Sequence, residues 1–269
     1  MKDHGMMDLH KPALLKWLTL LHDIADRADA IALLHFRSNR LRVDDKSDGS
    51  PVSEADRAIE AMARDLVASR VPELGVLGEE EGESSARTGA RLIIDPIDGT
   101  RNFVRGVPIF ASLLAIEDGG VVVAGVVSAP ALGQRWHAAK DEGAYCGTRR
   151  LRVSTVADLS RAHVFHGDLG GRTEGNVPAG LPSLLRAVER TRGFGDFYQH
   201  VLVAEGAGEA ALDFKMQPWD IAAVTILVEE AGGRATTLAG DDTIYGGSLV
   251  STNGLVHAAV AAFLAPRAM

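Results

Sequence analysis

Two aspartates, Asp95 and Asp98, lie close together directly after the apolar run at residues 92–94. A short apolar run that ends in Pro and Gly is typical of a buried strand that leads into a tight turn. The two carboxylates are therefore expected to emerge together at the carboxyl end of this strand. At such close range they repel each other, so at least one pKa would rise unless a cation lay between them. The pair predicts a metal site in outline.

Asp, Pro and Gly are also ordinary turn residues, so residues 95–100 alone are compatible with a simple turn. Two further acidic segments weaken that alternative: residues 78–81, and Trp219-Asp220 at the start of an apolar periodic stretch. An all-oxygen site selects hard divalent cations, and no Cys or His pair lies nearby to favour zinc. Mg2+ is therefore the expected ion, with Mn2+ as a possible substitute.

Other common catalytic patterns are absent from the sequence. It contains no phosphate-loop lysine motif, no Ser-centred nucleophile elbow and no His-Glu-x-x-His pair. The short Gly193-Phe194-Gly195 run lacks the later glycine of a dinucleotide-binding fingerprint. The chemistry is therefore expected to come from the carboxylates.

The acidic segments resemble the signatures of the inositol monophosphatase superfamily of magnesium-dependent, lithium-sensitive phosphatases. The matching segments are residues 78–80, 95–100 and 219–220. The resemblance covers most of the chain. Within the superfamily, three other segments look most like the bacterial histidinol-phosphatase branch, namely residues 102–108, 125–132 and 195–197.

The resemblance implies a set of metal ligands. Glu79 and Asp95 would hold one Mg2+ with help from the carbonyl oxygen of Ile97. Asp95, Asp98 and Asp220 would hold a second ion, which makes Asp95 the bridging and catalytic carboxylate. A third, weaker position would rest on Glu79 and waters. Two such ions can lower the pKa of an attacking water and stabilise the leaving oxygen of a phosphate monoester, without a covalent phosphoenzyme.

The resemblance also implies roles for residues around the metals. Thr100 and Glu79 are expected to orient the attacking water, which makes both catalytic. The backbone N–H groups of Gly99 and Thr100 are expected to bind phosphate, because a glycine lets the chain approach an anion closely. Lys46 and Asp56 fall where the family has a lysine and an acid that support the metal site from outside. A solvated loop charge and a helix cap are the respective alternatives.

The alcohol side of the site should reveal the substrate, because inositol is neutral whereas histidinol carries an ammonium group and an imidazole. Asp196 could pair with that amine, or be an ordinary loop carboxylate. Asp213 stands where the family usually has a glutamate that contacts the substrate, so the side chain here is shorter by one methylene. Asn102 replaces an acid usual in the adenosine-bisphosphate phosphatases, which counts against that branch. Phe197 and Trp219 could flank the imidazole, although both types are more often core residues.

The leading hypothesis is a magnesium-dependent phosphomonoesterase that hydrolyses L-histidinol phosphate in histidine biosynthesis. Inositol-1-monophosphatase activity is the alternative within the same chemistry. Some superfamily members are also accessory proteins of the transcription machinery, so a partner-binding role with incidental phosphatase activity is an alternative of another class.

Composition sets the cellular context. The 269 residues are 46% hydrophobic and 24% charged, which suffices for one large core or two joined halves. A formal net charge of -8 argues against a general nucleic-acid or anionic-membrane surface. The single cysteine, Cys146, cannot form an internal disulfide, and no signal peptide or membrane-length run is visible. A cytoplasmic protein is expected, and the resemblance implies a homodimer.

The pattern along the chain predicts mixed α/β structure. Apolar residues at helical spacing predict a long helix over residues 14–32, a second helix that starts at Ser53, and a helix over residues 221–231 that carries Asp220 in its first turn. Strands are expected at residues 92–94, 111–116, 121–128 and 135–138, with an edge strand at residues 151–154.

The resemblance implies a layered α/β/α/β/α sandwich of the inositol monophosphatase and fructose-1,6-bisphosphatase type. We expect an N-terminal half over residues 1–150, which carries most metal ligands. A C-terminal half over residues 151–269 would carry Asp220 and the residues on the substrate side. The polar, glycine-rich residues 167–180 are expected to form a surface connection near the boundary.

Overall fold

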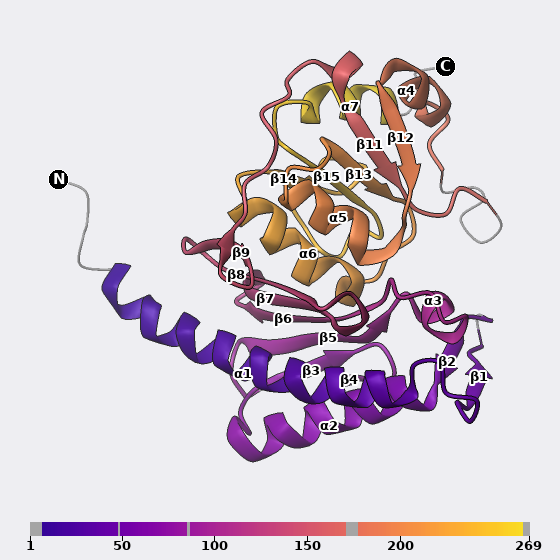
Figure 1. Cartoon of the computed structure of the whole chain (residues 1–269). Helices are drawn as coiled ribbons and strands as arrows, with labels where there is room; N and C mark the ends of the chain where they lie inside the picture. The colour runs from indigo at the N-terminus through magenta and orange to yellow at the C-terminus, as the bar shows by residue number, and fades with distance from the viewer. Residues whose placement is uncertain (1–6, 48, 85–86, 171–176, 266–269) are drawn as a thin grey trace.

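The computed structural model describes residues 7–47, 49–84, 87–170 and 177–265. Its elements stack in five layers, as Figure 1 shows. Three layers of helices alternate with two β-sheets, so that each sheet has helices on both faces. The first layer holds α1 (Met7–His35) and α2 (Glu54–Arg70). The middle helical layer holds α5 (Asp196–Ala204) and α6 (Pro218–Glu230). The last holds α4 (Leu181–Ala187) and α7 (His257–Leu264). The expected α/β/α/β/α sandwich is confirmed.

The larger sheet has eight strands in the order β10-β9-β8-β7-β6-β5-β3-β4. All neighbours are antiparallel except β3 and β5, which run parallel. In chain order the strands are β3 (Gly75–Gly78), β4 (Gly82–Ser84), β5 (Ala90–Asp98), β6 (Ala111–Asp118), β7 (Val121–Ala129), β8 (Gln134–Ala139), β9 (Gly143–Cys146) and β10 (Arg149–Arg150). The four strands predicted between residues 92 and 138 are thus confirmed.

The smaller sheet has five strands in the order β12-β11-β13-β15-β14. They are β11 (His163–His166), β12 (Arg190–Gly193), β13 (Ala210–Asp213), β14 (Arg234–Thr236) and β15 (Leu249–Thr252). The remaining elements are the hairpin of β1 (Val43–Asp45) and β2 (Pro51–Ser53), the short helix α3 (Thr100–Val104), and two 3-10 turns, η1 (Pro130–Leu132) and η2 (Leu159–Arg161). The division into halves at residue 150 stays a prediction.

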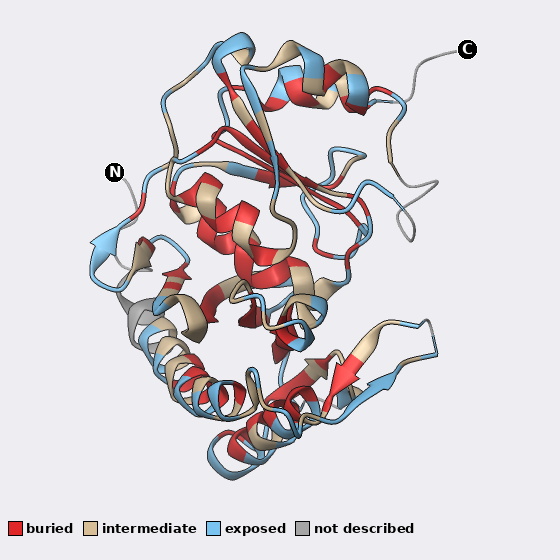
Figure 2. Cartoon of the chain, turned by 45° about the vertical axis from the view of Figure 1, so that its right-hand side comes forward, coloured by how far each residue is buried: buried red, intermediate tan, exposed pale blue. Residues whose placement is uncertain are grey.

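The cores explain why the helices lie where they do. One face of the large sheet packs on the inward sides of α1 and α2, where Leu21, Ile24 and Ile59 are fully buried. The other face packs on α6, whose residues Ile221 and Leu227 are also fully buried. A helix between two sheets must be apolar on nearly all sides. Figure 2 accordingly shows the middle helical layer largely in the colour of buried residues.

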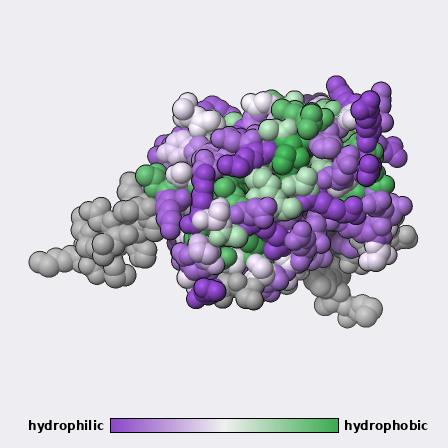
Figure 3. Space-filling view, turned by 90° about the horizontal axis from the view of Figure 1, so that it is seen from below, coloured by the Kyte–Doolittle hydropathy of each residue, from purple (hydrophilic) through white to green (hydrophobic). Residues whose placement is uncertain are grey.

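The outer face of the first layer is mainly hydrophilic. Figure 3, which looks at the molecule from the side of α1 and α2 in Figure 1, shows mostly polar side chains with apolar ones between them. Leu15, Leu33 and Leu34 of α1 are exposed here. Within the described ranges, no helix has both the length and the apolar composition needed to cross a membrane.

Local signals set the helix starts that matter for the site. Ser53 caps α2, since its side chain accepts a hydrogen bond from the N–H of Ala55 while Asp56 accepts one from the N–H of Ser53. Gln217 and Asp220 form the corresponding capping pair of α6, with Pro218 in its first turn. The predicted helix starts at Ser53 and near Asp220 are confirmed.

Two connections of the chain differ from simple strand or loop expectations. The edge strand predicted at residues 151–154 is wrong, because the sheet ends with β10. Leu151 is buried in the core, and the N–H of Val153 binds the carbonyl of Ala231 just after α6, so this segment follows a helix end rather than a strand. Of the connection expected at residues 167–180, residues 171–176 lie outside the described residues, and residues 167–170 and 177–180 form no helix or strand.

Candidate active site

Three carboxylates from two layers converge where the large sheet meets the middle helical layer. Asp95 and Asp98 lie at the end of β5, and Asp220 lies in the first turn of α6. Each offers an oxygen within 4.8 Å of the other two. Oδ1 of Asp95 is buried and, among the described residues, has no hydrogen-bond partner. The structure therefore brings together three of the residues that the sequence singled out.

The backbone fixes these carboxylates. The register between β5 and β6 shifts between Asp95 and Asp98, and this irregularity brings both side chains to one end of the strand. Oδ2 of Asp98 accepts a hydrogen bond of 2.6 Å from the N–H of Phe197 at the start of α5. Oδ2 of Asp220 accepts one of 2.7 Å from the N–H of Gln217. Two helix starts thus orient the acids that face Asp95.

The electrostatics of the cluster favour a cation. Burial, followed by repulsion from the neighbouring carboxylates, raises the pKa of Asp95 and of Asp98 well above the usual value. Burial likewise raises the pKa of Asp220 to about 7. Hydrogen bonds from the Phe197 and Gln217 amides act in the opposite direction but do not outweigh burial. The unpartnered oxygen of Asp95 and the all-oxygen donor set fit a hard divalent ion such as Mg2+.

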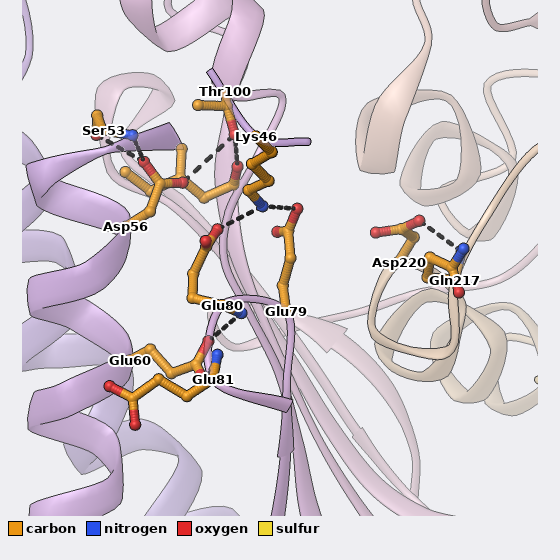
Figure 4. A network of polar contacts seen from close by, with 11 residues as sticks. Lys46, Ser53, Asp56, Glu60, Glu79, Glu80, Glu81, Thr100, Gln217 and Asp220 are labelled. Atoms are coloured by element: carbon orange, nitrogen blue, oxygen red, sulfur yellow. Dashed lines mark hydrogen bonds and ion pairs between the residues drawn. The ribbon is translucent and has the colours of Figure 1, made fainter. Parts of the chain in front are cut away.

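Glu79 follows β3 and lies beside β5, because Gly78 pairs with Ile94 in the parallel ladder and the Glu79 N–H binds the Ile94 carbonyl. Its carboxylate forms an ion pair with Lys46, whose Nζ lies 2.7 Å from Oε1 of Glu79 and 2.7 Å from Oε1 of Glu80 (Figure 4). Burial opposes the charge of Lys46, but these two carboxylates outweigh it and raise the Lys46 pKa. Burial raises the Glu80 pKa to about 7. Lys46 is therefore an ion-pair partner of both glutamates rather than a solvated loop charge.

Asp56 and Thr100 form a second polar group beside the cluster (Figure 4). Asp56 is fully buried and accepts hydrogen bonds from the N–H and the hydroxyl of Ser53, at 2.9 Å and 2.6 Å. The Thr100 hydroxyl lies 3.3 Å from Oδ1 of Asp56 and 2.9 Å from the carbonyl oxygen of Ile97. Burial raises the pKa of Asp56 to about 6. Asp56 is therefore a helix cap that also contacts Thr100, and its support of a metal site stays a prediction.

A pocket of about 440 Å³ opens next to these groups. Residues from distant parts of the chain line it: Ser50, Pro51, Glu79, Gly99, Thr100, Arg101, Asn102, Gly167, Asp168, Gly193, Phe194, Gly195 and Asp196. Gly99 has a φ of 80°, and a Cβ there would lie 3.2 Å from Oδ2 of Asp196. Glycine is therefore needed both for the backbone conformation and for the close approach of the acid.

Asp196 lines this pocket at the first position of α5, with a φ of 53°. Its Oδ2 lies 3.2 Å from the side-chain amide nitrogen of Asn102, which also donates to the carbonyl of Ile109. Burial and then the charge of Asp213 raise the pKa of Asp196 to about 7. The structure thus holds this carboxylate at the pocket wall through Asn102, a contact that the sequence did not reveal.

Asp213, at the end of β13, is held by α5. Its Oδ2 accepts a hydrogen bond from Gln199 and lies 3.2 Å from Nε2 of His200, whose Nδ1 lies 2.9 Å from the Ser251 hydroxyl. A Cβ at Gly167 would lie 1.9 Å from Oδ1 of Asp213, so this carboxylate packs directly against the pocket wall. Neither Gln199 nor His200 was singled out in the sequence, because a buried helix residue carries no signal of its partner.

The aromatic side of the pocket differs from the expectation. Phe197 is 1% exposed and belongs to the core, and Trp219 packs against the same core. Phe194 lines the pocket instead and contacts the rings of Phe165 and Tyr198. The turn at Gly195 explains the difference, because Phe194 before it and Asp196 directly after it line the pocket, whereas Phe197 in the first turn of α5 packs into the core.

Comparison with known proteins identifies the family. The family model described as the inositol monophosphatase family matches residues 14–267. The chain belongs to this family. A histidinol-phosphatase of Mycobacterium tuberculosis is 47% identical over 245 residues, which cover 89% of this chain and 94% of that protein.

Two solved structures have the same fold as this chain over most of its length. The extragenic suppressor protein suhB from Bartonella henselae superposes with a TM-score of 0.86 at 29% identity, covering 92% of this chain and 97% of the other. An IMPase from Thermotoga maritima gives a TM-score of 0.81 at 30% identity, covering 90% and 94%. The expected resemblance, including its histidinol-phosphatase branch, is confirmed.

Membership of the inositol monophosphatase family, with relatives that are histidinol-phosphatases, makes this protein a phosphoric monoester hydrolase. The family is metal-dependent and acts on small phosphorylated substrates, and the acidic cluster is a group that could bind such a metal.

Proposed function

We propose that this protein is a magnesium-dependent phosphatase that hydrolyses L-histidinol phosphate to L-histidinol and phosphate. The observation that carries the metal-dependent chemistry is the cluster of Asp95, Asp98 and Asp220, of which the first two are buried and the third is partly buried. One Asp95 oxygen in it has no hydrogen-bond partner within the described residues. The choice of substrate is supported by the 47% identity to a histidinol-phosphatase. The acidic wall of the pocket supports it as well.

The metal ligands that we propose are the carboxylates of Glu79, Asp95, Asp98 and Asp220 and the carbonyl of Ile97. When bound, two to three Mg2+ ions would activate the water nucleophile and stabilise the leaving oxygen. Charge supports this assignment: burial, and after it repulsion between the carboxylates, raises the pKa values of the three clustered acids, so a bound cation would stabilise their ionised forms. Mn2+ has a similar preference for oxygen ligands and is the expected substitute.

The residues of the chain have separate tasks in this proposal. Thr100 and Glu79 orient the attacking water. The position of the Thr100 hydroxyl between Asp56 and the Ile97 carbonyl supports the role of Thr100, because it fixes the direction of that oxygen. The N–H groups of Gly99 and Thr100 bind phosphate, and Lys46 neutralises excess charge next to Glu79.

The alcohol side of the pocket suits a cation. Asp196 and Asp168 line it, and Asp213 packs against its Gly167 wall. An ammonium group near Asp196 would relieve the burial and repulsion that raise the pKa of this acid to about 7. Phe194 offers an aromatic ring at the same pocket, where it can contact the imidazole of histidinol.

The test is phosphate release from L-histidinol phosphate and from inositol 1-phosphate, measured in parallel with Mg2+ and with EDTA. We expect a large preference in kcat/KM for histidinol phosphate, and loss of the activity in EDTA. A preference for inositol 1-phosphate would keep the chemistry and reject the substrate. Release that survives EDTA would reject the metal-dependent mechanism.

The accessory-protein alternative is motivated by the structural likeness to suhB. It predicts only incidental phosphate release from either ester, together with retention of the chain by components of the transcription machinery. Homodimerisation and a cytoplasmic location stay predictions, and gel filtration with light scattering tests the former.

A further inference from the structure

Glu60 of α2 is a completely buried carboxylate directly beneath the turn that carries Glu79 (Figure 4). Its Oε2 accepts a hydrogen bond of 2.8 Å from the N–H of Glu80, and its Oε1 accepts one of 3.0 Å from the N–H of Glu81. Two consecutive backbone N–H groups thus close around one carboxylate, an arrangement well suited to an anion.

Arg64, one helical turn later, completes this arrangement. Its Nε and one terminal nitrogen lie 3.0 Å and 2.7 Å from Oε1 of Glu60. The same terminal nitrogen donates a hydrogen bond of 2.6 Å to the carbonyl of Gly82, on the far side of the turn. Glu60 and Arg64 therefore contact the turn that joins β3 to β4 at three points of its backbone.

Gly78 shows how closely Glu60 approaches the chain. A Cβ at Gly78 would lie 2.2 Å from Oε1 and 2.4 Å from the carboxyl carbon of Glu60. Gly78 has no positive φ, so the backbone conformation does not require glycine. The position of the Glu60 carboxylate is what excludes a side chain immediately before Glu79.

Stability alone does not account for such a buried ion pair. Removing a carboxylate and a guanidinium from water costs several kcal/mol per ion, and a well-packed apolar pair is often as stable or more stable. The Glu60 contacts instead restrain the backbone on one side of Glu79, while the Glu79 N–H is bound by the Ile94 carbonyl of β5 on the other. The Cα of Glu79 is therefore held from both sides.

We propose that Glu60, held by Arg64, is a positioning residue that directs Glu79 toward the metal site and thereby sets its affinity for divalent ions. This inference rests on the proposed role of Glu79 as a metal ligand. Glu60 itself touches neither substrate nor metal, and it acts through the backbone of the Glu79–Glu80–Glu81 turn.

The test is Glu60→Gln, which keeps the shape but replaces the acceptor charge. Mn2+ affinity is measured by electron paramagnetic resonance or calorimetry in the absence of substrate, and the Mg2+ dependence of phosphate release is measured in parallel. We expect Mn2+ binding to weaken about tenfold, in the range typical for groups that orient metal ligands. We also expect kcat to be largely regained at saturating Mg2+.

Glu117→Gln is the matched control. Glu117, near the end of β6, is also a buried carboxylate, 3% exposed, and it lies 2.6 Å from an arginine, Arg91. Its other oxygen accepts a hydrogen bond from the Tyr245 hydroxyl, and none of these contacts involves the turn that carries Glu79. We expect this variant to lose thermal stability without a change in Mn2+ affinity. Equal Mn2+ affinities in Glu60→Gln and the wild type, or an equal loss in both variants, would overturn the proposal.

Two further variants keep the test decisive. If Glu60→Gln does not fold, Arg64→Lys is measured in the same way, because Arg64 is partly exposed and its loss leaves the Glu60 carboxylate in place. Glu79→Gln combined with the Glu60 or Arg64 variant should bind Mn2+ no more weakly than Glu79→Gln alone, and additive losses would contradict an action through Glu79.

The Mn2+ measurement needs no substrate, so it separates this inference from the choice of histidinol phosphate. A wild type that binds no Mn2+ would instead reject the metal site itself.

Discussion

The metal side and the alcohol side of the pocket are built in different ways. On the metal side, Asp95 and Asp98 come from one strand end, and Glu79 lies beside them because β3 runs parallel to β5. On the alcohol side, Asp196 and Asp213 come from α5 and β13 and are oriented by side-chain partners, Asn102 from a distant segment and His200 from α5.

This difference teaches how each side can change. The metal side is constrained by sheet hydrogen bonds and by mutual repulsion, so a single substitution there alters the chemistry for every phosphate ester. The alcohol side rests on side-chain contacts, so a substitution there should alter the choice of alcohol and leave the chemistry intact.

The largest effect is expected from Asp95→Asn on the metal side. The substitution keeps the shape but removes the proposed bridging charge, so kcat/KM should fall about a thousandfold or more for histidinol phosphate and inositol 1-phosphate alike. Melting temperature in EDTA should not fall, because the variant removes a repelling buried charge. The exposed Asp118→Asn is the control. Normal turnover in the Asp95 variant would refute the assignment of this site.

A smaller and selective effect is expected from Asp196→Asn on the alcohol side. Loss of a charged partner for the ammonium group should raise KM for histidinol phosphate about ten- to a hundredfold. KM for inositol 1-phosphate should change little, because that alcohol offers no cation. Steady-state kinetics with both esters measure the ratio. Equal changes for the two esters would make Asp196 a general structural residue of the pocket.

Metal removal should expose the repulsion on the metal side. The folded-state pKa of Asp220, about 7, lies above its unfolded value of 3.8, so its contribution to stability is present below pH 3.8 and is lost as pH rises through 7. In EDTA the contribution of Asp220 to the melting temperature should therefore decrease as the pH rises from 3.8 to about 7. The rise in melting temperature that Mg2+ causes should become larger over the same pH range. Thermal unfolding at several pH values, with and without Mg2+, measures both. A Mg2+ effect that shrinks with rising pH would contradict this account.

The smallest effect is expected far from the pocket, at His137 of β8. Burial, followed by the nearby His22 and Arg135, lowers the pKa of His137 to about 4. The unfolded chain thus binds a proton between pH 6.5 and 4 that the folded chain does not, and stability falls as the pH decreases through this window. His137→Phe preserves a ring against Tyr145, which stacks on His137 at 5.6 Å. It should reduce the acid sensitivity of the melting temperature in Mg2+. An unchanged pH profile would show that His137 does not titrate as inferred.

Much of the metal side could be predicted from the sequence because its signals are local. The apolar run before Asp95 indicated a buried strand, the Pro and Gly after it indicated a turn, and acids in that pattern indicated a cation. Asp220 was likewise predictable, since a carboxylate in the first turn of a helix has a local physical reason. The edge strand at residues 151–154 failed for the opposite reason, because its apolar residues pack on a helix end.

The alcohol side and the supporting contacts could not be predicted in this way. From the sequence, Glu60 would be predicted as an ordinary exposed charge on a helix. Only the tertiary packing of α2 buries its carboxylate against the turn. Phe194 and Phe197 are the same residue type, yet Phe194 before the turn at Gly195 lines the pocket and Phe197 after it is buried in the core.

The sequence by itself indicated a divalent-metal site, because acids at short spacing, strand patterns and helix caps are local properties of the chain, and its resemblance to a known family implied the phosphatase chemistry. The tertiary structure alone decided which distant groups meet these acids: the Phe197 N–H with Asp98, Asn102 with Asp196, and Glu60 with the turn after Glu79. Such contacts depend on how whole layers pack, and the burial that results from this packing is what shifts the pKa values and selects a cation.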